Sequence, residues 1–172
     1  MPKVTDSSPA SQRVRTLRVL RAAWYEVYAN GITSDSSRRT KHEVNLFKES
    51  EDTNLRRIQT QLQKKIYKFS PARGSLVDKS SGKKRTVVVP VVQDRVVQRA
   101  ILDTLQSMPG IDALIQVPTS FGAIKKRRVH DAIVAVVKTI KGGEVTHFLK
   151  SDIKDFFPGI PREKVINSKL TG

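Results

Sequence analysis

The stretch FLKSDIKDFFPGI, residues 148–160, decides the predicted fold of this chain. Its pattern predicts a short buried strand that ends at a carboxylate, Asp152, followed by a turn and the start of a helix. Two acids, two lysines and two adjacent phenylalanines are crowded into these residues, which is more charge than a core strand needs. Hard cations such as Mg²⁺ take oxygen ligands and are commonly shared with a substrate phosphate. The stretch therefore indicates a cation site that meets phosphate.

A second acid, Asp155, follows Asp152 at a spacing of three residues. Two dications about 4 Å apart repel each other unless several carboxylates neutralise them, so a pair of acids would suit two-metal phosphoryl transfer. Residues three apart on a strand face opposite sides, however, and Asp155 would reach the same cations only if the backbone turned at Lys154. An aspartate that caps the following turn is the structural alternative, and the local sequence favours it.

The composition indicates a globular protein with a polyanionic partner. The chain has 172 residues, of which 38% are hydrophobic and 28% charged, as in one folded domain or slightly more. Its 32 Lys and Arg residues outnumber 16 Asp and Glu residues, which gives a formal net charge of +16. Such a field concentrates anions at the surface, so nucleic acid and an anionic membrane are the two candidate partners.

The sequence lacks several features that would indicate a secreted, zinc-binding or membrane-spanning protein. Without cysteine it forms no disulfide and no cysteine-ligated zinc site. No apolar run approaches the roughly 18 residues that a membrane span needs, and the polar N-terminus shows no secretory signal. These features predict a cytoplasmic protein without a membrane span.

Two helices are predicted in the first third of the chain, after a start at residues 1–12 that is predicted to be disordered. The first helix runs from Val14 to Tyr28, and the second covers about residues 41–68. Each has an apolar stripe suited to a core, and basic residues off the stripe that either contact phosphate or are only solvated. The stripes are Leu17, Leu20, Trp24, Val27 and Tyr28 in the first helix, and Leu55, Ile58, Leu62, Ile66 and Phe69 in the second.

A basic β-hairpin is predicted next. Residues 73–79 and 83–89 form its arms, joined by the turn at residues 80–82. A cationic tip suits a loop that closes on phosphates, but it would equally protect an edge strand from aggregation. The local sequence does not choose between these two roles. The cations that flank the turn are Lys79, Lys83, Lys84 and Arg85.

Helices and one strand are predicted in the remainder of the chain. A helix begins near Val92, with an apolar face that includes Ile101 and Leu105. The further predicted elements are a helical turn at residues 111–115, a helix from Val129 to Ile140 with Ile133, Val134, Val137 and Ile140 as its core face, a strand from Val145 to Ser151, and a helix from Pro161 to about Leu170.

Three blocks, in order, resemble the reverse transcriptases of bacterial group II introns and their retron-like relatives. The first is KSSGKKR at residues 79–85, with VP at 89–90 and QDRVVQRA at 93–100; it resembles the family pattern K-x-x-G-K-x-R-P … I-P … D-R-x-x-Q. The second, SFG at 120–122 with HDAI at 130–133, resembles S-Y-G-F-R … H-x-A. The third, SDIKDFFPGI at 151–160, resembles polymerase motif A, D-I-K-x-F-F-x-x-I. The resemblance covers about residues 55–170.

The resemblance implies roles for individual residues. Asp152 would be the catalytic ligand of Mg²⁺, with the Ile153 carbonyl beside it, and Phe157 would be the steric gate that excludes a 2′-hydroxyl. Lys79 and Arg85 would clamp the incoming triphosphate. Asp155 falls at a variable family position and is not assigned to the metal. Residues expected at the nucleic acid are Lys83, Lys84, Gln98, Ser120, Phe121 and Gly122.

The chain also departs from the family pattern. Thr86 replaces the proline after the arginine, and Ala123 replaces the aromatic residue after Ser-Phe-Gly, which puts the fine template contacts in question. The family's second catalytic block, an aromatic-Ala-Asp-Asp turn, does not occur in these 172 residues. Because one catalytic aspartate cannot neutralise two metal ions, this polypeptide alone is expected not to polymerise DNA.

The predicted fold class is α+β: the fingers and truncated palm of a right-hand polymerase, with helices, a basic β-hairpin and a partial antiparallel sheet. Residues 1–40 would be an N-terminal helix and flexible basic linker, residues 41–143 the RNA- and nucleotide-binding fingers, and residues 144–172 the start of the palm. The predicted function is RNA-directed DNA polymerisation, and the predicted partners are an RNA template, a DNA or RNA primer, dNTPs, and intron or retron RNA.

A non-enzymatic, maturase-like RNA-binding protein from a truncated reverse transcriptase gene is the alternative. The charge of +16 supports both functions, because counterion release gives affinity without chemistry. A membrane-surface protein has little support, since the apolar stripes are core-like and no interfacial tryptophan cluster accompanies them. Residues 94–98 favour a group II intron origin, whereas residues 156–160 favour retrons and related antiviral defence enzymes.

Overall fold

The computed structural model describes residues 9–78, 82, 84–122, 124, 127–143, 145, 147–153, 159–161 and 163–164. The chain divides into two compact units, Met1–Ser120 and Phe121–Gly172. This division does not coincide with the predicted functional regions 1–40, 41–143 and 144–172, which stay predictions about function.

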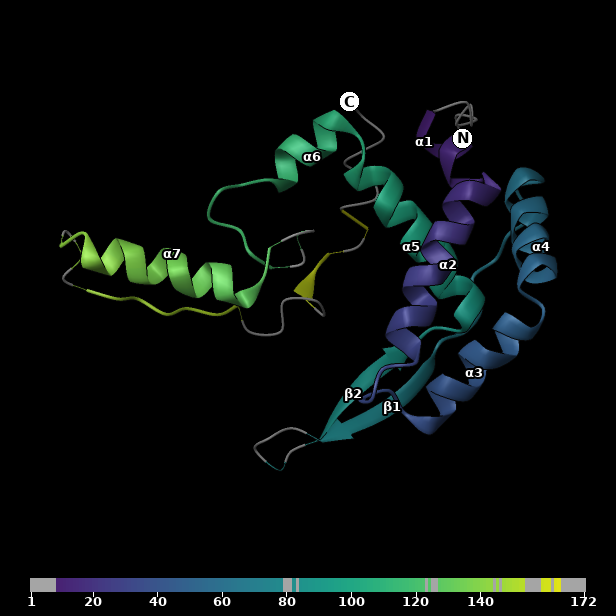
Figure 1. Cartoon of the computed structure of the whole chain (residues 1–172), viewed down its shortest axis with the longest axis horizontal. Helices are drawn as coiled ribbons and strands as arrows, with labels where there is room; N and C mark the ends of the chain where they lie inside the picture. The colour runs from purple at the N-terminus through teal and green to yellow at the C-terminus, as the bar shows by residue number, and fades with distance from the viewer. Residues whose placement is uncertain are drawn as a thin grey trace. The chain divides into compact units, whose positions relative to one another are not determined.

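The first unit is helical with one hairpin, and the second contains a single long helix among its described residues. Figure 1 shows α2 and α5 lying against each other in the first unit, with the hairpin extending from the start of α5. The elements are α1 (Pro9–Val14), α2 (Leu17–Gly31), α3 (Arg38–Glu49), α4 (Glu51–Gln63), β1 (Arg73–Asp78), β2 (Lys84–Val89), α5 (Val92–Gln106) and α6 (Pro109–Ile115) in the first unit, and α7 (Val129–Lys141) in the second.

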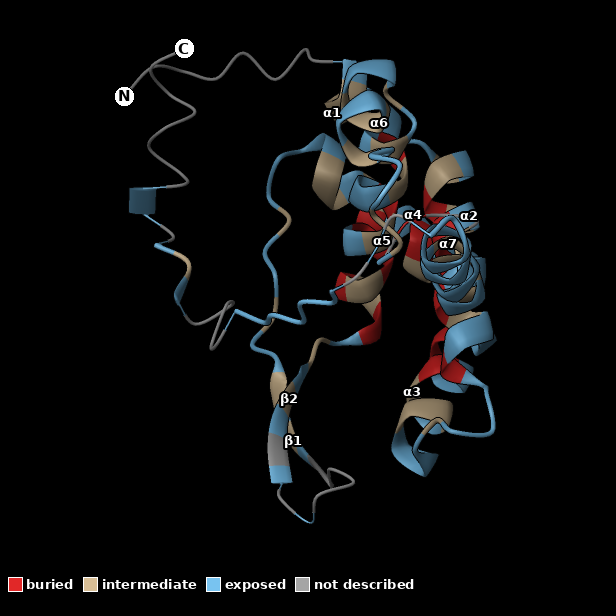
Figure 2. Cartoon of the chain, turned by 90° about the vertical axis from the view of Figure 1, so that its left-hand side faces the viewer, coloured by how far each residue is buried: buried red, intermediate tan, exposed pale blue. Residues whose placement is uncertain are grey.

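The core of the first unit lies where α2, α3, α4 and α5 meet (Figure 2). Trp24 at its centre stacks at a tilt on Phe47, with ring centroids 4.5 Å apart. Gly31 lets the end of α2 approach α3, since a Cβ there would lie 2.7 Å from Cγ1 of Val44. The predicted stripe of the first helix is confirmed, with its central residues buried and its ends partly buried. The buried core residues are Leu20, Ala23, Trp24, Val27, Val44, Phe47, Leu55, Ile58, Val92, Val96, Val97 and Ala100.

The predicted helix over residues 41–68 is wrong in its extent, because two helices occupy this region. The chain breaks at Ser50, whose φ and ψ of −127° and 39° are not helical, and α4 begins with Glu51 and Asp52 in its first turn, where acids favour a helix start. Asn54 bonds back to the Phe47 carbonyl at 3.1 Å and holds the corner. Because α4 ends at Gln63, the last two residues of the predicted stripe, Ile66 and Phe69, are exposed.

The start of the chain and of α2 also differs from the prediction. Part of the segment predicted to be disordered, residues 9–12, belongs to α1; residues 1–8 lie outside the described residues. The first long helix begins at Leu17 rather than Val14, because the Thr16 hydroxyl accepts a hydrogen bond from the Val19 N–H and caps it.

The predicted hairpin is confirmed. β1 and β2 pair antiparallel from Arg73 opposite Val89 to Asp78 opposite Lys84, and Gly82 in the connecting turn has a φ of 73°, a conformation that favours glycine. Leu76 and Val88 are about two-thirds exposed, so the hairpin's middle does not contribute to the core. A two-stranded hairpin is marginally stable by itself, and its base must therefore be held by the helical unit.

A buried carboxylate on α5 holds the segment that leads into the hairpin. Asp94 is 1% exposed, and it accepts hydrogen bonds from the Tyr67 hydroxyl at 2.5 Å and from the Ser70 N–H at 2.8 Å. Both donors lie between the end of α4 and the start of β1. Buried charges persist in proteins only with such partners, so this contact fixes the path of residues 67–70 across α5.

The second unit departs from two predictions. α7 is confirmed, but its predicted core face is exposed, with Ile133, Val134 and Val137 between 43% and 56% accessible. No strand is found over residues 145 and 147–151, the described part of the predicted strand 145–151. Both differences have one reason: a stripe or a strand is buried only by a partner, and the described residues of this unit contain neither a pairing strand nor a second complete helix. Most of the predicted helix 161–170 lies outside the described residues.

Removing the Tyr67 hydroxyl should destabilise the first unit in a pH-dependent way. Burial, and then the hydrogen bond to Asp94, raise the pKa of Tyr67. We expect Tyr67→Phe to lower the free energy of unfolding by about 1–2 kcal/mol at pH 7. A folded pKa above the unfolded value of about 10 gives stability that is present below pH 10 and lost above it.

Urea denaturation between pH 7 and pH 11 would measure this effect. The difference in free energy of unfolding between Tyr67→Phe and the unmodified chain should become smaller above pH 10. It should fall by less than about 1.4 kcal/mol per pH unit, because Tyr67 is only half-buried. Tyr25→Phe, on the exposed face of α2, is the control and should change little. A difference that stays constant from pH 7 to pH 11 would contradict the assignment.

Candidate nucleic-acid interface

The hairpin presents part of the predicted phosphate clamp. Lys84 is exposed at the first position of β2, directly after the turn. The backbone of Arg85 pairs with that of Val77 in the sheet, but its side chain is not described. Lys79 and Lys83 lie outside the described residues. The position of Lys84 therefore places at least one cation at the projecting end of the hairpin.

Three arginines surround one glutamate at the base of the hairpin. The Glu43 carboxylate on α3 accepts hydrogen bonds from Arg73 Nη1 at 2.7 Å and from Arg39 Nε at 3.0 Å. Partial burial alone would raise the pKa of Glu43, but the hydrogen bonds and charges of Arg73 and Arg39 hold it below its usual value. Arg95 on α5 also interacts electrostatically with Glu43 and Arg73. We call these four residues the Glu43 cluster, and its formal charge is positive.

Arg95 is the unusual member of the Glu43 cluster. Its Nε and Nη2 atoms are shielded from solvent and have no hydrogen-bond acceptor among the described residues. Burial lowers the pKa of Arg95; Glu43 acts against this effect, and Arg73 adds to it. A buried donor left without an acceptor costs about 1–3 kcal/mol. These two nitrogens of Arg95 are therefore desolvated and without an acceptor among the described residues.

Gln98, predicted to contact nucleic acid, is exposed one helical turn after Arg95. Arg99, the next residue, differs from Arg95 because its charge is matched: Nε bonds Asp103 at 2.9 Å, and Nη2 lies 3.7 Å from Glu26. Those partners, above all the hydrogen bond to Asp103, raise the pKa of Arg99. Gln98 therefore provides a neutral amide on α5 beside two arginines, of which Arg99 is ion-paired and Arg95 is not hydrogen-bonded to a carboxylate of the described residues.

The Ser-Phe-Gly block is divided between the two units, because the first unit ends at Ser120 and the second begins at Phe121. The Ser120 N–H bonds the Val117 carbonyl at 3.0 Å and closes a turn at the end of the first unit. In the second unit, the Phe121 ring is half-buried, with the Arg127 guanidinium carbon 5.9 Å from its centroid, and Gly122 is exposed. An aromatic ring with an arginine beside it can stack on a base.

The predicted metal site is incompletely described. Asp152 is exposed, Ile153 is 69% exposed, and Phe157 and Asp155 lie outside the described residues. Among the residues that the structure describes, no three His, Asp or Glu side chains gather into a metal site. A lone exposed carboxylate does not fit two Mg²⁺ ions, which need several oxygen ligands and charge neutralisation. The assignment of Asp152 to Mg²⁺ stays a prediction.

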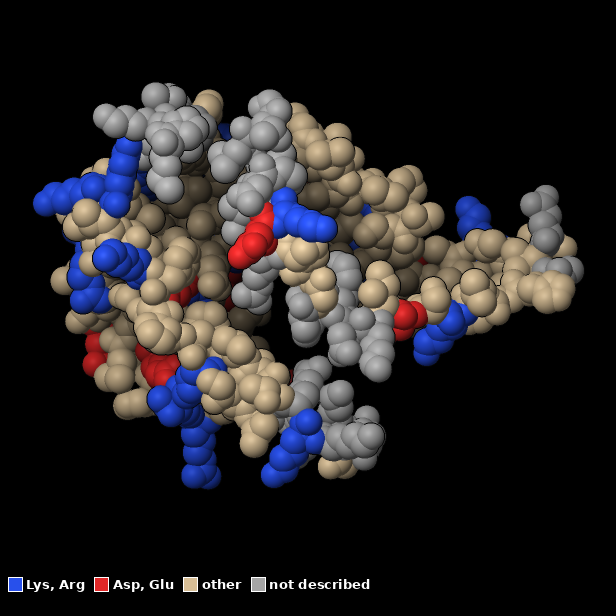
Figure 3. Space-filling model, turned by 180° about the vertical axis from the view of Figure 1, so that it is seen from behind, with Lys and Arg blue, Asp and Glu red and all other residues tan. Residues whose placement is uncertain are grey.

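Basic side chains are distributed widely over the surface. Figure 3 shows Lys and Arg side chains projecting singly from many points of one face, with fewer Asp and Glu among them. Some of these cations are paired, as Arg21 is with Asp52 at 2.5 Å. None of the helices in the described part of the chain combines the length and apolar character that crossing a bilayer requires.

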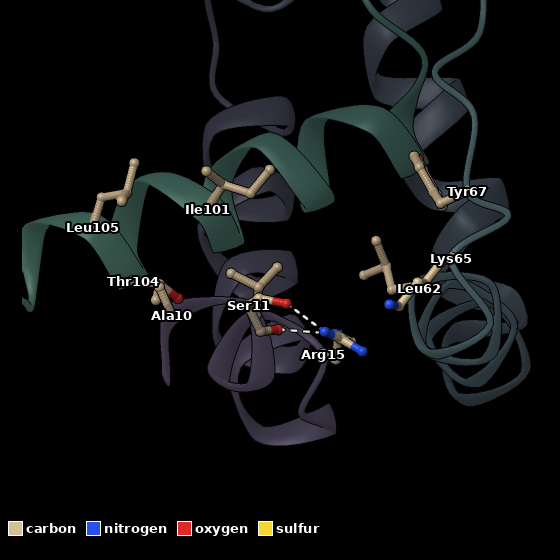
Figure 4. Close-up of a pocket in the computed structure, with 10 residues that line it drawn as sticks. Ala10, Ser11, Arg15, Leu62, Lys65, Tyr67, Ile101, Thr104 and Leu105 are labelled. Carbon is tan, nitrogen blue, oxygen red and sulfur yellow. Dashed lines mark hydrogen bonds between the residues drawn. The ribbon is translucent and has the colours of Figure 1, made fainter. Parts of the chain in front are cut away.

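A cavity of about 550 Å³ lies apart from the predicted site residues, between α1, the end of α4 and α5 (Figure 4). Leu62, Ile101 and Leu105 make much of its wall. The Arg15 side chain folds back on Ser11, bonding its carbonyl through Nε at 3.1 Å. The wall is mainly apolar and contains none of the residues predicted to bind nucleotide or nucleic acid.

Sequence patterns missed the Glu43 cluster. Its members, Arg39, Glu43, Arg73 and Arg95, come from α3, β1 and α5 and are up to 56 residues apart in the chain, so no local spacing reveals them. Arg95 was visible only as the second letter of the D-R-x-x-Q block, without a role. The signal that could have singled it out is its spacing of three residues from Gln98, which places both on one helix face.

Comparison with curated proteins connects the chain with an intron-encoded protein. The chain is 30% identical over 105 residues to a protein of Schizosaccharomyces pombe described as an uncharacterized 91 kDa protein in the cob intron. The match covers 61% of this chain and 12% of that protein, so the chain spans about an eighth of its relative's length. No family model matches the chain.

Neutralising Glu43 should destabilise the base of the hairpin. We expect Glu43→Gln to lower the free energy of unfolding by about 1–2 kcal/mol at pH 7, because two charge-assisted hydrogen bonds weaken and three guanidinium groups lose their carboxylate. The folded pKa of Glu43 is depressed. Its stabilisation is therefore complete above the ordinary value of about 4.3 and is lost as the pH falls through the lower, folded value.

Urea denaturation at pH 7, 5, 4 and 3 would follow this loss, and the variant and the unmodified chain should converge at the acid end. Glu49→Gln, exposed on the same helix, is the matched control and should be nearly neutral at pH 7. Equal stabilities of Glu43→Gln and Glu49→Gln at pH 7 would show that the Glu43 cluster does not hold the hairpin.

Proposed function

We propose that this chain is the fingers and first palm segment of an intron-type reverse transcriptase, and that it binds RNA through the hairpin and the adjoining side of α5. The observation that carries the proposal is the tethering of the hairpin. Its base is held by Arg73 on Glu43 and by Asp94 on residues 67–70, while Lys84 lies at the far end, next to the turn. A cationic hairpin whose base is held in place suits a loop whose tip closes on phosphates.

Sequence comparison supports the intron connection independently of the structure. The 105 matched residues belong to a protein whose printed description places it in an intron, and the three ordered blocks resemble intron and retron reverse transcriptases. In this proposal, Lys79, Arg85 and Phe157 contact the incoming dNTP, and Asp152 with the Ile153 carbonyl contributes to the Mg²⁺ site. Lys83, Gln98, Ser120, Phe121 and Gly122 contact template or primer.

A non-enzymatic RNA-binding or maturase-like role is the second candidate, and the exposed Asp152 favours it. In the described residues this carboxylate is not accompanied by the further ligands that two-metal chemistry needs. The cationic hairpin would then serve to hold structured RNA rather than a nucleotide. The two candidates share RNA binding, which one measurement tests. A second measurement tests for nucleotide transfer, which would exclude the non-enzymatic role if it were found.

RNA binding should depend on the hairpin more than on charge in general. We expect the chain to bind a fluorescein-labelled single-stranded RNA in an anisotropy titration, with an affinity that falls as salt rises from 50 to 200 mM. Lys83→Gln/Lys84→Gln should weaken binding about tenfold at low salt and reduce the slope of log K against log[salt] by about 1.4, or 0.7 per lost phosphate contact.

Lys64→Gln/Lys68→Gln removes the same charge near the end of α4 and is the matched control. It should weaken binding much less than the hairpin variant. Equal losses from both pairs would mean that affinity comes from overall charge, and the hairpin would have no special role. No detectable binding by the unmodified chain at 50 mM salt would refute the proposed function itself.

Primer extension tests whether this chain transfers nucleotides by itself, which the non-enzymatic candidate excludes. We expect no extension of a DNA primer annealed to an RNA template when this chain is supplied with Mg²⁺ and dNTPs, because Asp152 is the single aspartate that matches a catalytic family position in these 172 residues. A Phe157→Ala chain and an Asp152→Asn chain would be assayed in parallel. Template-dependent extension that Asp152→Asn abolishes would contradict the expectation and establish the enzyme in this chain.

A further inference from the structure

A small pocket adjoins the Glu43 cluster, where the end of α2 packs on α5. It has a volume of about 290 Å³, and its lining is Val27, Asn30, Arg95, Gln98, Arg99 and Leu102. We call it the Arg95 pocket. Its volume is close to the lower limit of roughly 300 Å³ found for small-molecule sites, so it suits a small group rather than a large ligand.

Side chains of two kinds meet in the Arg95 pocket. Val27, which is buried in the core, and Leu102, which is 46% exposed, are the apolar residues of the lining. Asn30, Gln98, Arg95 and Arg99 provide amide and guanidinium donors. No acidic side chain belongs to the lining, although Asp103 and Glu26 reach Arg99 from outside it. The pocket is therefore rich in donors and poor in negative charge.

Arg95 is the donor whose charge is least satisfied. Arg99 has a carboxylate hydrogen-bonded at 2.9 Å, whereas Glu43, which acts on Arg95 electrostatically, already accepts from Arg73 and Arg39. Nε and Nη2 of Arg95 have no acceptor within the described part of the chain. An anion with several oxygens suits such unused donors, and phosphate has the geometry for paired N–H···O contacts. Because both nitrogens are shielded from solvent in this structure, those contacts require the Arg95 side chain to turn toward the pocket.

The spacing along α5 turns Arg95 toward this pocket and its neighbour away from it. Adjacent residues on a helix do not face the same side, whereas residues three apart do. Asp94 accordingly points to Tyr67 and Ser70, while Arg95 and Gln98 line the pocket together. The acid at position 94 therefore does not neutralise Arg95.

We propose that the Arg95 pocket binds one backbone phosphate of single-stranded RNA, with Arg95 as the phosphate ligand and Gln98 as a neutral donor to the same nucleotide. This proposal rests on the proposed RNA-binding function and adds to it a contact away from the hairpin tip. RNA is the favoured source of the phosphate because the chain carries a formal charge of +16, which concentrates polyanions at its surface.

Anisotropy titration of the full chain with a labelled 12-nucleotide oligouridine is the first test. Arg95→Gln should weaken binding about tenfold and lower the salt slope by about 0.7, as for one lost phosphate contact. Arg95→Lys should weaken binding less and keep the slope, because the charge remains while the paired geometry is lost. Gln98→Ala should weaken binding about threefold with an unchanged slope, since a neutral donor releases no counterion.

Two further variants control for general charge and for folding. Arg56→Gln removes an exposed charge from α4 and should change affinity less than twofold. Leu102→Trp fills the pocket without changing charge and should weaken binding as Gln98→Ala does. If Arg95→Gln loses its helical circular dichroism, Gln98→Ala and Leu102→Trp decide the outcome. Normal binding by both of these variants, or an equal loss from Arg56→Gln and Arg95→Gln, would overturn the proposal.

Nuclear magnetic resonance of the Arg95 Nε–H group identifies the source of the phosphate. Uridine 5′-monophosphate should shift this signal, and uridine should not. Inorganic phosphate that shifts it equally, and displaces the oligouridine, would overturn the nucleotide assignment in favour of a free-anion site. Oligouridine binding that is unaffected by every pocket variant would refute the pocket but leave the proposed function standing. A nucleotide shift without oligouridine binding would refute the function instead.

Discussion

The buried carboxylate of Asp94 is the constraint on which the arrangement of the first unit depends. At 1% exposure it must be satisfied inside the protein, and its partners are the Tyr67 hydroxyl and the Ser70 N–H. These partners lie in the segment that crosses from α4 to β1, so the first turn of α5 sets where the hairpin begins. The Arg73–Glu43 contact ties the same strand to α3. A hairpin that would be marginal alone is thereby attached to a four-helix core at two points.

The spacing of apolar residues correctly predicted the helices that bury one face in the core. The stripes of α2 and the start of α5 emerged as predicted because Leu20, Trp24, Val96 and Val97 face one core. The same rule failed at Ser50, where the backbone leaves the helical conformation and two acids begin a new helix, so that one long periodic stretch is divided into α3 and α4. It also failed for the α7 face, because a stripe gives the direction of burial but not the identity of the partner that covers it.

The candidate site was predictable only where its members are neighbours in sequence. The cations around the hairpin turn follow from one short block, and Lys84 lies at the projecting end as that block implies. The Glu43 cluster joins three elements through side chains of Arg39, Arg73 and Arg95. Such a cluster depends on how α3, β1 and α5 pack, which a pattern of 2 or 3.6 residues does not encode. The role of Asp152 depends on ligands outside the described residues and stays a prediction.

The D-R-x-x-Q block can be understood from helix geometry. Its aspartate and arginine are adjacent and must face different sides, while its arginine and glutamine are three apart and must share one. The aspartate accepts hydrogen bonds from two neutral donors, Tyr67 and Ser70. Its carboxylate therefore orders the segment before the hairpin and does not neutralise Arg95. Three guanidinium groups then share Glu43, an arrangement in which like charges repel. A phosphate at Arg95 would relieve that repulsion, so the contact that orders the hairpin also leaves a cation ready for a polyanion.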